Sequence, residues 1–455
     1  MPLRAPLLCA SLFLVSLGAA EPGGAMLFSS YETFDVSIKA AFDDLFAKAQ
    51  RNPDYSVPAV VGYTDPQTGE EATIDGVVSV RGRTSKRETE CAFPKLKLRF
   101  TGEGQGQTAS SVFRGMKAIK IGTHCGEQAD DDLTERFGRW ANEKAPLREA
   151  FVYRLLDVFR VRSFKARPAR ITYVFASGRR LARNGMILED DREAMKRLGA
   201  DHEIEPQQFR DAERDFSPAD TAKLAFAEAF IGNFDWCLKF FAADTYRCDA
   251  RRRLWNVFAF APSNGRAFPV LYDFDIAGMV VGRHRWFPRV FYAGFLESKS
   301  APAIEVTAQV QHTRSVFPRD VLDETRRAFV ERKAEAFRAL HDADLDADGR
   351  SLIETHLTSF FGAIERDDRF YAPVVVRARE PIYLDADRTQ PACPQDNGAP
   401  AGTLVGPPLR TQGDMIQAAI LDVEWRWAPP ARCDAVHEGP VWIDRRAIGT
   451  DYPKR

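Results

Sequence analysis

Phe-Ile-Gly-Asn-Phe-Asp-Trp at residues 230–236 and Leu-Tyr-Asp-Phe-Asp at residues 271–275 are the stretches that decide the fold. The first follows Ser217-Pro218-Ala219-Asp220, which predicts a helix start because it supplies an N-cap, a first-turn proline and an acid at the third position. Gly232 is expected to end this helix, since glycine readily adopts the left-handed conformation. The polar residues of the first stretch therefore follow a helix C-terminus.

A predicted hairpin carries two further polar groups to the same neighbourhood. Residues 254–260 and 267–272 are expected to be apolar strands joined by a Pro-Ser-Asn-Gly turn. Asn256 lies on the first strand, Asp273 follows the second, and Asp235 lies on the loop after the helix. Each residue alone suits a hydrogen-bonded loop cap. The ordered set favours phosphoryl transfer, in which one carboxylate accepts a proton while an amide and a carboxylate hold Mg²⁺.

These motifs resemble the catalytic half of atypical kinases of the CotH and HipA types, where Gly-Asn-x-Asp precedes an Asn and a Tyr-Asp pair. Trp255 stands where the resembling secreted bacterial proteins carry a His. The resemblance covers roughly residues 27–370 and implies an α+β, two-lobed protein-kinase-like fold. It also implies Asp235 as the catalytic base, Asn256 and Asp273 as metal ligands, and Mg²⁺ and ATP as cofactors.

The same resemblance implies a strand lysine that contacts phosphate and pairs with a helix glutamate. Lys97 and Lys120, on predicted strands 96–100 and 118–121, both fit this role, and the choice between them stays open. Glu149 is the matching glutamate, on a predicted helix.

Two further residues are candidate nucleotide contacts. Arg83 lies in a basic loop that either folds over phosphates or forms a solvated hairpin tip. Glu189 ends a predicted strand; it either belongs to the crossover that holds a nucleotide base or caps the next helix. The capping role is favoured for Glu189.

Composition and charge are those of an ordinary globular protein. The 455 residues include 63 basic and 64 acidic ones, which gives a net charge of −1. A general nucleic-acid binder needs a basic excess, so this class is not expected. The length suffices for two or three domains.

Residues 1–20 have the pattern of a secretory signal peptide. Arg4 supplies the positive charge, residues 7–17 are apolar, and small residues up to Ala20 predict cleavage there. No later segment has 18 uninterrupted apolar residues, so no transmembrane segment is expected in the mature chain. A periplasmic or secreted protein is predicted.

The mature chain would keep six cysteines. An even number in an oxidising compartment favours disulfides, and the C-x-x-C spacing of a metal cluster does not occur. Fifteen connectivities are possible, and the nearest partners by element are Cys91–Cys125, Cys237–Cys248 and Cys393–Cys433.

The chain divides into a signal peptide (1–20) and four further parts. A β-rich N-lobe (21–190) precedes a mainly helical C-lobe (191–380), a Pro- and Gly-rich linker (381–412) and a small all-β unit (413–455) that weakly resembles an SH3-like barrel. Within these parts, helices are predicted at 38–49, 320–340 and 352–364. An acidic turn at 342–349 resembles a calcium loop but lacks the twelfth-position glutamate, so helix capping is favoured.

Three functions follow from these patterns. The first is an exported kinase-like phosphotransferase that acts on a protein or envelope acceptor. The second is a catalytically inactive kinase-like protein with a binding or structural role in the envelope. The third is a metal-dependent hydrolase that uses the same carboxylates.

Overall fold

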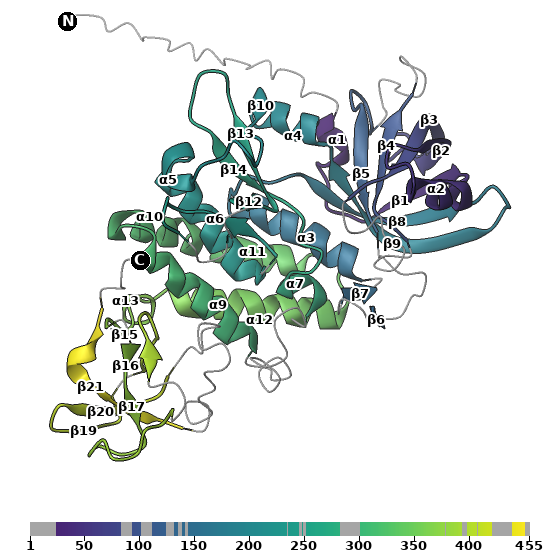
Figure 1. Cartoon of the computed structure of the whole chain (residues 1–455). Coiled ribbons are helices and arrows are strands. Elements are labelled where there is room, and N and C mark those ends of the chain that lie inside the picture. Colours follow the sequence, from purple (N-terminus) through teal and green to yellow (C-terminus); the bar gives the residue numbers. More distant parts are fainter. Residues whose placement is uncertain are drawn as a thin grey trace, which may run out of the picture.

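A β-barrel, a helical region and a small β unit make up the described part of this α+β protein. In the computed structural model, the helical region lies between the other two (Figure 1). Arg83, three cysteines (Cys91, Cys125 and Cys433) and the predicted signal peptide lie outside the described residues. The described residues are 24–82, 93–101, 112–123, 132–134, 139–141, 144–233, 235–244, 248, 252–282, 301–377, 379–393, 398–406, 408–420 and 439–450.

Within the described residues, seven strands close the barrel in the order β1-β2-β3-β4-β5-β9-β8. β1 pairs with β8 in parallel, and β2 and β3 continue the sheet in antiparallel fashion. Alternate side chains point inward, as the strand period requires, and form a separate apolar core. The strands are β1 (Phe34–Ala40), β2 (Ser56–Thr64), β3 (Glu71–Val80), β4 (Leu96–Phe100), β5 (Ala118–Gly122), β8 (Ala166–Val174) and β9 (Arg180–Glu189).

The predicted helix at 38–49 is wrong in its first part. Residues 38–40 end β1, whose side chains alternate between buried and exposed positions and whose backbone pairs with β2 and β8. The helix in this segment is only α2 (Phe42–Ala49), and its Phe42 and Leu45 are buried in the barrel core. A period of two residues prevails over the helical one here because strands are available on both sides of residues 34–40.

The helical region contains most of the described helices. The predicted helix at 320–340 is interrupted after residue 330, where Arg332 donates a hydrogen bond to the Val158 carbonyl at the end of α3 (3.1 Å). The helices are α3 (Ala145–Val158), α4 (Asp191–Arg197), α5 (Ala212–Asp215), α6 (Pro218–Ile231), α7 (Gly278–Val281), α9 (Ala301–His312), α10 (Arg319–Val330), α11 (Lys333–His341), α12 (Ala347–Ile364) and α13 (Asp367–Phe370).

Helix α6 begins and ends at the residues that the sequence indicates. The Ser217 hydroxyl oxygen accepts a hydrogen bond from the Asp220 amide (3.1 Å), and Gly232 adopts φ 64° and ψ 37°. A Cβ atom at Gly232 would lie 2.7 Å from Cε1 of His356. Both the conformation and the close approach therefore require glycine, and they set the direction in which the following loop leaves the helix.

The predicted hairpin is present, with an interruption at Asn256. β13 (Val257–Ala261) pairs with β14 (Phe268–Leu271), whereas β12 (Leu254–Trp255) pairs with β11 (Cys237–Leu238). Asn256 lies between β12 and β13 with φ 54°. The chain therefore passes from one small sheet to the other at this residue.

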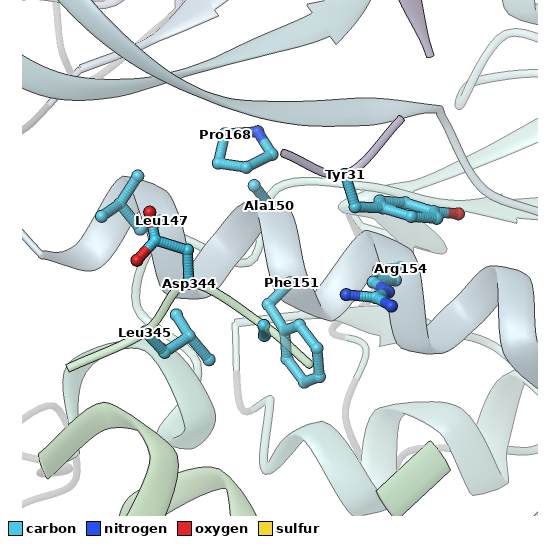
Figure 2. Close-up of a pocket in the computed structure, with 9 residues that line it drawn as sticks. Tyr31, Leu147, Ala150, Phe151, Arg154, Pro168, Asp344 and Leu345 are labelled. Atoms are coloured by element: carbon cyan, nitrogen blue, oxygen red, sulfur yellow. The ribbon is translucent and has the colours of Figure 1, made fainter. Parts of the chain in front are cut away.

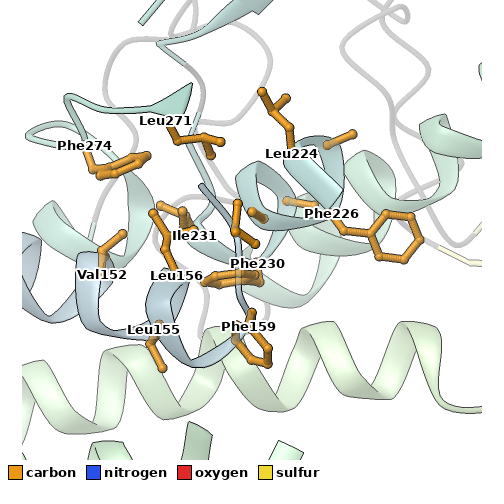
Figure 3. Close-up of a cluster of buried hydrophobic side chains, with 14 of the residues drawn as sticks. Val152, Leu155, Leu156, Phe159, Leu224, Phe226, Phe230, Ile231, Leu271 and Phe274 are labelled. Carbon is orange, nitrogen blue, oxygen red and sulfur yellow. The ribbon is translucent and has the colours of Figure 1, made fainter. Parts of the chain in front are cut away.

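Phenylalanine-rich packing holds α3, α6, α12 and the hairpin together. Figure 3 shows Phe159 and Phe230 facing each other between helices, with Leu271 and Phe274 on the hairpin side. The Phe159 and Phe230 ring centroids are 5.1 Å apart. Burial of such side chains contributes roughly 2–3 kcal/mol each, so the segments that carry the polar motifs rest on a rigid base.

The small C-terminal unit has its own apolar core. Its largest sheet has the order β17-β21-β20-β19 and is formed by β17 (Ile382–Tyr383), β21 (Val441–Asp444), β20 (Met415–Ala418) and β19 (Arg410–Gln412).

The predicted disulfide Cys237–Cys248 is confirmed, and Cys393 is also disulfide-bonded, to a partner outside the described residues. In the acidic turn, Asp346 caps α12 by accepting from the Gly349 amide (3.2 Å).

Candidate functional site

A buried lysine joins the barrel to the hairpin of the helical region. Lys95 directly precedes β4, and its Nζ atom lies 2.5 Å from Asp273 Oδ1 and 3.0 Å from Asp275 Oδ2. The side chain of Lys95 is 10% exposed, against 32% for Asp273 and 21% for Asp275. The cation is therefore sequestered, while the two carboxylates still reach solvent.

Two side chains of helix α3, one turn apart, hold the backbone of this cluster. Glu149 Oε1 accepts a hydrogen bond from the Phe274 amide (3.3 Å), and the Tyr153 hydroxyl accepts one from the Asp273 amide (3.1 Å). The rings of Tyr153 and Phe274 also pack, with centroids 5.1 Å apart. Positions i and i+4 of a helix share one face, so α3 holds both backbone amides at once.

The charges in the cluster shift one another's protonation. Burial raises the pKa of the Glu149 carboxyl to about 7, although the nearby Lys95 opposes the shift. Burial alone would lower the pKa of the Lys95 ammonium, but the carboxylates of Asp273, Asp275 and Glu149 hold it above its ordinary value. Lys95 is therefore a permanent cation at neutral pH, and Glu149 is poised between its two forms.

Asp235 and Asn256 form the second half of the site. Asn256 Nδ2 donates to the Asp235 carbonyl (2.6 Å) and to its Oδ2 atom (3.1 Å), while Trp255 Nε1 donates to Oδ1 (3.2 Å). The side-chain oxygen of Asn233 accepts from the Asp235 amide (3.0 Å). The residue that replaces the usual histidine of the resembling proteins, Trp255, thus orients the candidate base.

Backbone contacts bring the Lys95–Asp273 cluster and the Asp235–Asn256 pair close together. The Gly278 amide donates to the Gly232 carbonyl (2.9 Å), which ties the turn after Asp273 to the end of α6. Val257 pairs with Leu271, so Asn256 and the segment entering Asp273 lie at the same end of the hairpin. The structure therefore collects the three residues of the sequence motif at one end of the hairpin.

Asn256 and Asp273 share a strained backbone. They have φ values of 54° and 65°, a region that costs non-glycine residues on the order of 1 kcal/mol. Asparagine and aspartate tolerate this region better than most residues. The surrounding contacts hold both in place, which is the pattern expected where side chains must take a particular direction.

Oxygen atoms of these residues have the chemistry that Mg²⁺ prefers. Both hydrogen bonds described for the Asn256 side chain use its nitrogen, so its carbonyl oxygen can serve as a ligand beside the Asp273 carboxylate. In the described part of the chain, no group of three or more His, Cys, Asp and Glu side chains has the arrangement of a metal site. The candidate ligands here are the Asn256 amide oxygen and the Asp273 carboxylate. Because asparagine is not one of those four residue types, these ligands would not form a group of that kind.

The two lysines indicated by the sequence lie elsewhere on the barrel. Lys97 and Lys120 face each other across β4 and β5; Lys97 Nζ is 2.5 Å from Asp190 Oδ2, and Lys120 donates to Asp191. Among the described residues, the ion pair with Asp273 is made by Lys95. Sequence reasoning missed Lys95 because positions 95 and 97 lie on the same face of a strand, and periodicity cannot choose between them.

Glu189 fastens the end of β9 and does not cap the following helix. Its carboxylate accepts from the Lys165 amide (3.0 Å) and from Arg197 (2.7 and 2.9 Å). The N-cap of α4 is Asp190, which accepts from the Arg192 amide. The favoured sequence interpretation of Glu189 is therefore wrong by one residue.

A small cavity lies between α3, the start of β8 and the turn before α12. Figure 2 shows Tyr31, Phe151, Pro168 and Leu345 around it. Its free volume of about 20 Å³ is enough for a single water molecule. This cavity is too small for a nucleotide.

Comparisons with known proteins find similarity at the level of structure. No family model matches the chain, and no curated protein matches it. The crystal structure of the proinflammatory kinase CtkA from Helicobacter pylori is similar at 9% sequence identity and a TM-score of 0.30, over 60% of this chain and 88% of that chain. No helix among the described residues is long and apolar enough to cross a membrane.

Proposed function

We propose that this chain is a kinase-like phosphotransferase with its site at the junction of barrel and hairpin. The observation that carries the proposal is the contact of Lys95, from the barrel, with Asp273 and Asp275, from the hairpin. A buried cation beside two partly exposed carboxylates suits a ligand that brings phosphates and a divalent metal together. Lys95 takes the role that the sequence offered to Lys97 or Lys120.

Asp235 is the proposed proton acceptor. Its carboxylate is held by Trp255 and Asn256, so it cannot rotate away from an acceptor hydroxyl at the hairpin end. When that hydroxyl attacks phosphorus, its proton passes to Asp235. Positioning of this kind and electrostatic stabilisation supply most of the catalysis in phosphoryl transfer.

Asn256 and Asp273 are the proposed ligands of Mg²⁺. The metal, when bound, would neutralise charge on the phosphates of ATP. Lys95 would then exchange part of its contact with Asp273 for a phosphate oxygen, while Glu149 and Tyr153 keep the backbone of residues 273–274 in place.

We further propose that the protein is exported and acts on a protein or envelope component. The signal-like segment at residues 1–20 supports export, and the confirmed disulfide Cys237–Cys248 is consistent with an oxidising compartment. Cys237 begins β11, two residues after Asp235, so the disulfide also supports the loop that carries the proposed base.

Thermal unfolding with Mg²⁺ and ATP tests the site, beside two matched variants. Ligand at 100 times its dissociation constant stabilises the parent by roughly 2.7 kcal/mol. Asp273→Asn should lose this stabilisation. Asp235→Asn should retain it while losing transfer of labelled phosphate to an acceptor. Absence of any shift in the parent would refute the nucleotide site, and a shift with Mg²⁺ alone would favour the metal-dependent hydrolase.

A catalytically inactive binding protein is the second candidate. Both carboxylate oxygens of Asp235 already accept hydrogen bonds from protein donors, as they would in a purely structural loop. This alternative predicts nucleotide stabilisation without transfer, and the same stabilisation in Asp235→Asn. The transfer measurement therefore separates the two candidates.

A further inference from the structure

A second, larger cavity lies on the outer face of the barrel and is rich in positive charge. It has a volume of about 820 Å³ and lies over β3, β4 and the start of β5, beside α4. Six cationic side chains and three acidic ones are among its described lining residues. The cations are Arg81, Lys97, Arg99, Lys117, Arg192 and Lys196.

The three acidic side chains offset only half of the six cations, which leaves a net positive charge on the lining. Lys97 pairs with Asp190. Within the described part of the chain, the side chains of Arg99, Lys117, Arg192 and Lys196 make no ion pair. Because these four cations have no ion-pair partner, an anion that enters the cavity gains their attraction without breaking an existing pair. The charge pattern therefore indicates an anionic ligand.

The cavity continues the candidate site along one strand face. Lys95, Lys97 and Arg99 occupy alternate positions at and in β4, so their side chains project from the same face at intervals of about 7 Å. Arg81 lines the cavity, and its charge also acts on Lys95 and Glu149. A row of cations thus leads from the cavity to the pair Lys95–Asp273.

We propose that this cavity binds a linear chain of phosphates whose terminal unit reaches Lys95. No aromatic side chain occurs among the described residues that line it, so it offers no stacking surface for a nucleobase. Lysine and arginine side chains bind phosphate oxygens, so the successive cations along β4 can contact different phosphates of one chain. The binding stands by itself; only the role of the chain as phosphoryl donor rests on the proposed function.

As a donor, inorganic polyphosphate would supply the transferred phosphoryl group in place of ATP. The bond between the terminal phosphorus and its bridging oxygen breaks, and a bond to the acceptor hydroxyl oxygen forms. The hydroxyl proton goes to Asp235, and the chain leaves one phosphate shorter. No oxidant, reductant or further reactant is needed.

Calorimetric titration with inorganic tripolyphosphate, orthophosphate and ATP tests the proposal on the full oxidised chain. Arg99→Gln with Lys117→Gln removes two cations that have no described partner. Arg170→Gln with Arg180→Gln removes two exposed cations from β8 and β9, outside the cavity, and serves as the charge-matched control.

The parent should bind tripolyphosphate more tightly than orthophosphate. The cavity variant should weaken tripolyphosphate binding by roughly tenfold or more, and the control by less than about twofold. Equal weakening in both variants, or binding of ATP without binding of tripolyphosphate, would overturn the proposal. Asp273→Asn should still bind tripolyphosphate, so loss of transfer in that variant bears on the proposed function alone.

Discussion

Two sets of lysine–carboxylate pairs lie on the same outer face of the barrel, and they differ in how far their partners are along the chain. The site cluster joins Lys95 to Asp273 and Asp275, from the distant hairpin. The second set joins Lys97 to Asp190 and Lys120 to Asp191. These are called the exit pairs, because Asp190 and Asp191 directly follow β9, where the chain leaves the barrel. The first set connects two parts of the molecule, and the second stays close to the barrel.

The two sets also differ in backbone strain and in the direction in which the pKa of their buried acid is shifted. Asp273 is held at φ 65°, whereas Asp190 has an ordinary φ of −75° and caps α4. The site cluster also keeps Glu149 buried, with a raised pKa. Strained backbone and a perturbed buried acid cost stability, and proteins retain them where side-chain direction matters for function. In the exit pairs, burial of Asp190 is outweighed by its hydrogen bond with Lys97, which lowers the pKa of the Asp190 carboxyl. These pairs therefore show no strained backbone and no acid with a raised pKa, which favours a structural role.

Replacing Lys95 should have the largest effect. Lys95→Met leaves three carboxyl groups without their cation, so phosphoryl transfer should fall by on the order of 10²–10³-fold. Stability should fall as well, by roughly 3 kcal/mol, because a partner of a buried pair is lost. Product formation with Mg²⁺ and ATP, together with urea unfolding, measures both. If activity is unchanged, Lys95 has no role in transfer, and the site cluster does not differ in function from the exit pairs.

Glu149→Gln should change the pH dependence of stability. In the parent, the raised pKa stabilises the folded state fully below about pH 4.5, and this contribution of up to about 3 kcal/mol is lost as pH rises through about 7. Glutamine can still accept from the Phe274 amide but does not titrate. Urea unfolding from pH 4.5 to 8 should therefore give a flatter profile for the variant. Parallel profiles would contradict the assignment.

Lys120→Met should have a small effect. Burial already lowers the pKa of Lys120, its Nζ atom lies 4.4 Å from the Phe164 ring centroid, and its partner Asp191 reaches solvent. An apolar side chain of similar volume suits this place, so stability should change by less than about 1 kcal/mol. Transfer activity should persist. A loss as large as that of Lys95→Met would place Lys120 in the site.

Arg160→Gly should have the smallest effect and the opposite sign. Arg160 follows α3 in the left-handed conformation (φ 54°), where glycine is preferred, so stability should rise by about 0.5–1 kcal/mol. Thermal unfolding measures the gain. Asp273→Gly relieves similar strain but removes a proposed ligand, so phosphoryl transfer should fall about as far as in Lys95→Met. The two variants thereby distinguish backbone strain that has no role in transfer, at Arg160, from backbone strain at a proposed metal ligand, at Asp273.

Much of the fold could be predicted because its signals are local. The Ser217 cap, Gly232 and the apolar strands each depend on neighbouring residues, and all appear in the structure. The helix predicted at 38–49 was partly wrong because strand pairing on both sides of β1 is a tertiary effect.

The sequence by itself determined which residue types gather after α6 and at the hairpin: Asp235, Asn256 and Asp273 are adjacent to elements with strong local signals. Only the tertiary structure decided that Lys95 meets Asp273 and that Lys97 and Lys120 turn to Asp190 and Asp191. Strand periodicity places all of these lysines on one face, but the partner depends on where the helical region packs against the barrel. That position is set by buried side chains from many segments, which no local pattern contains.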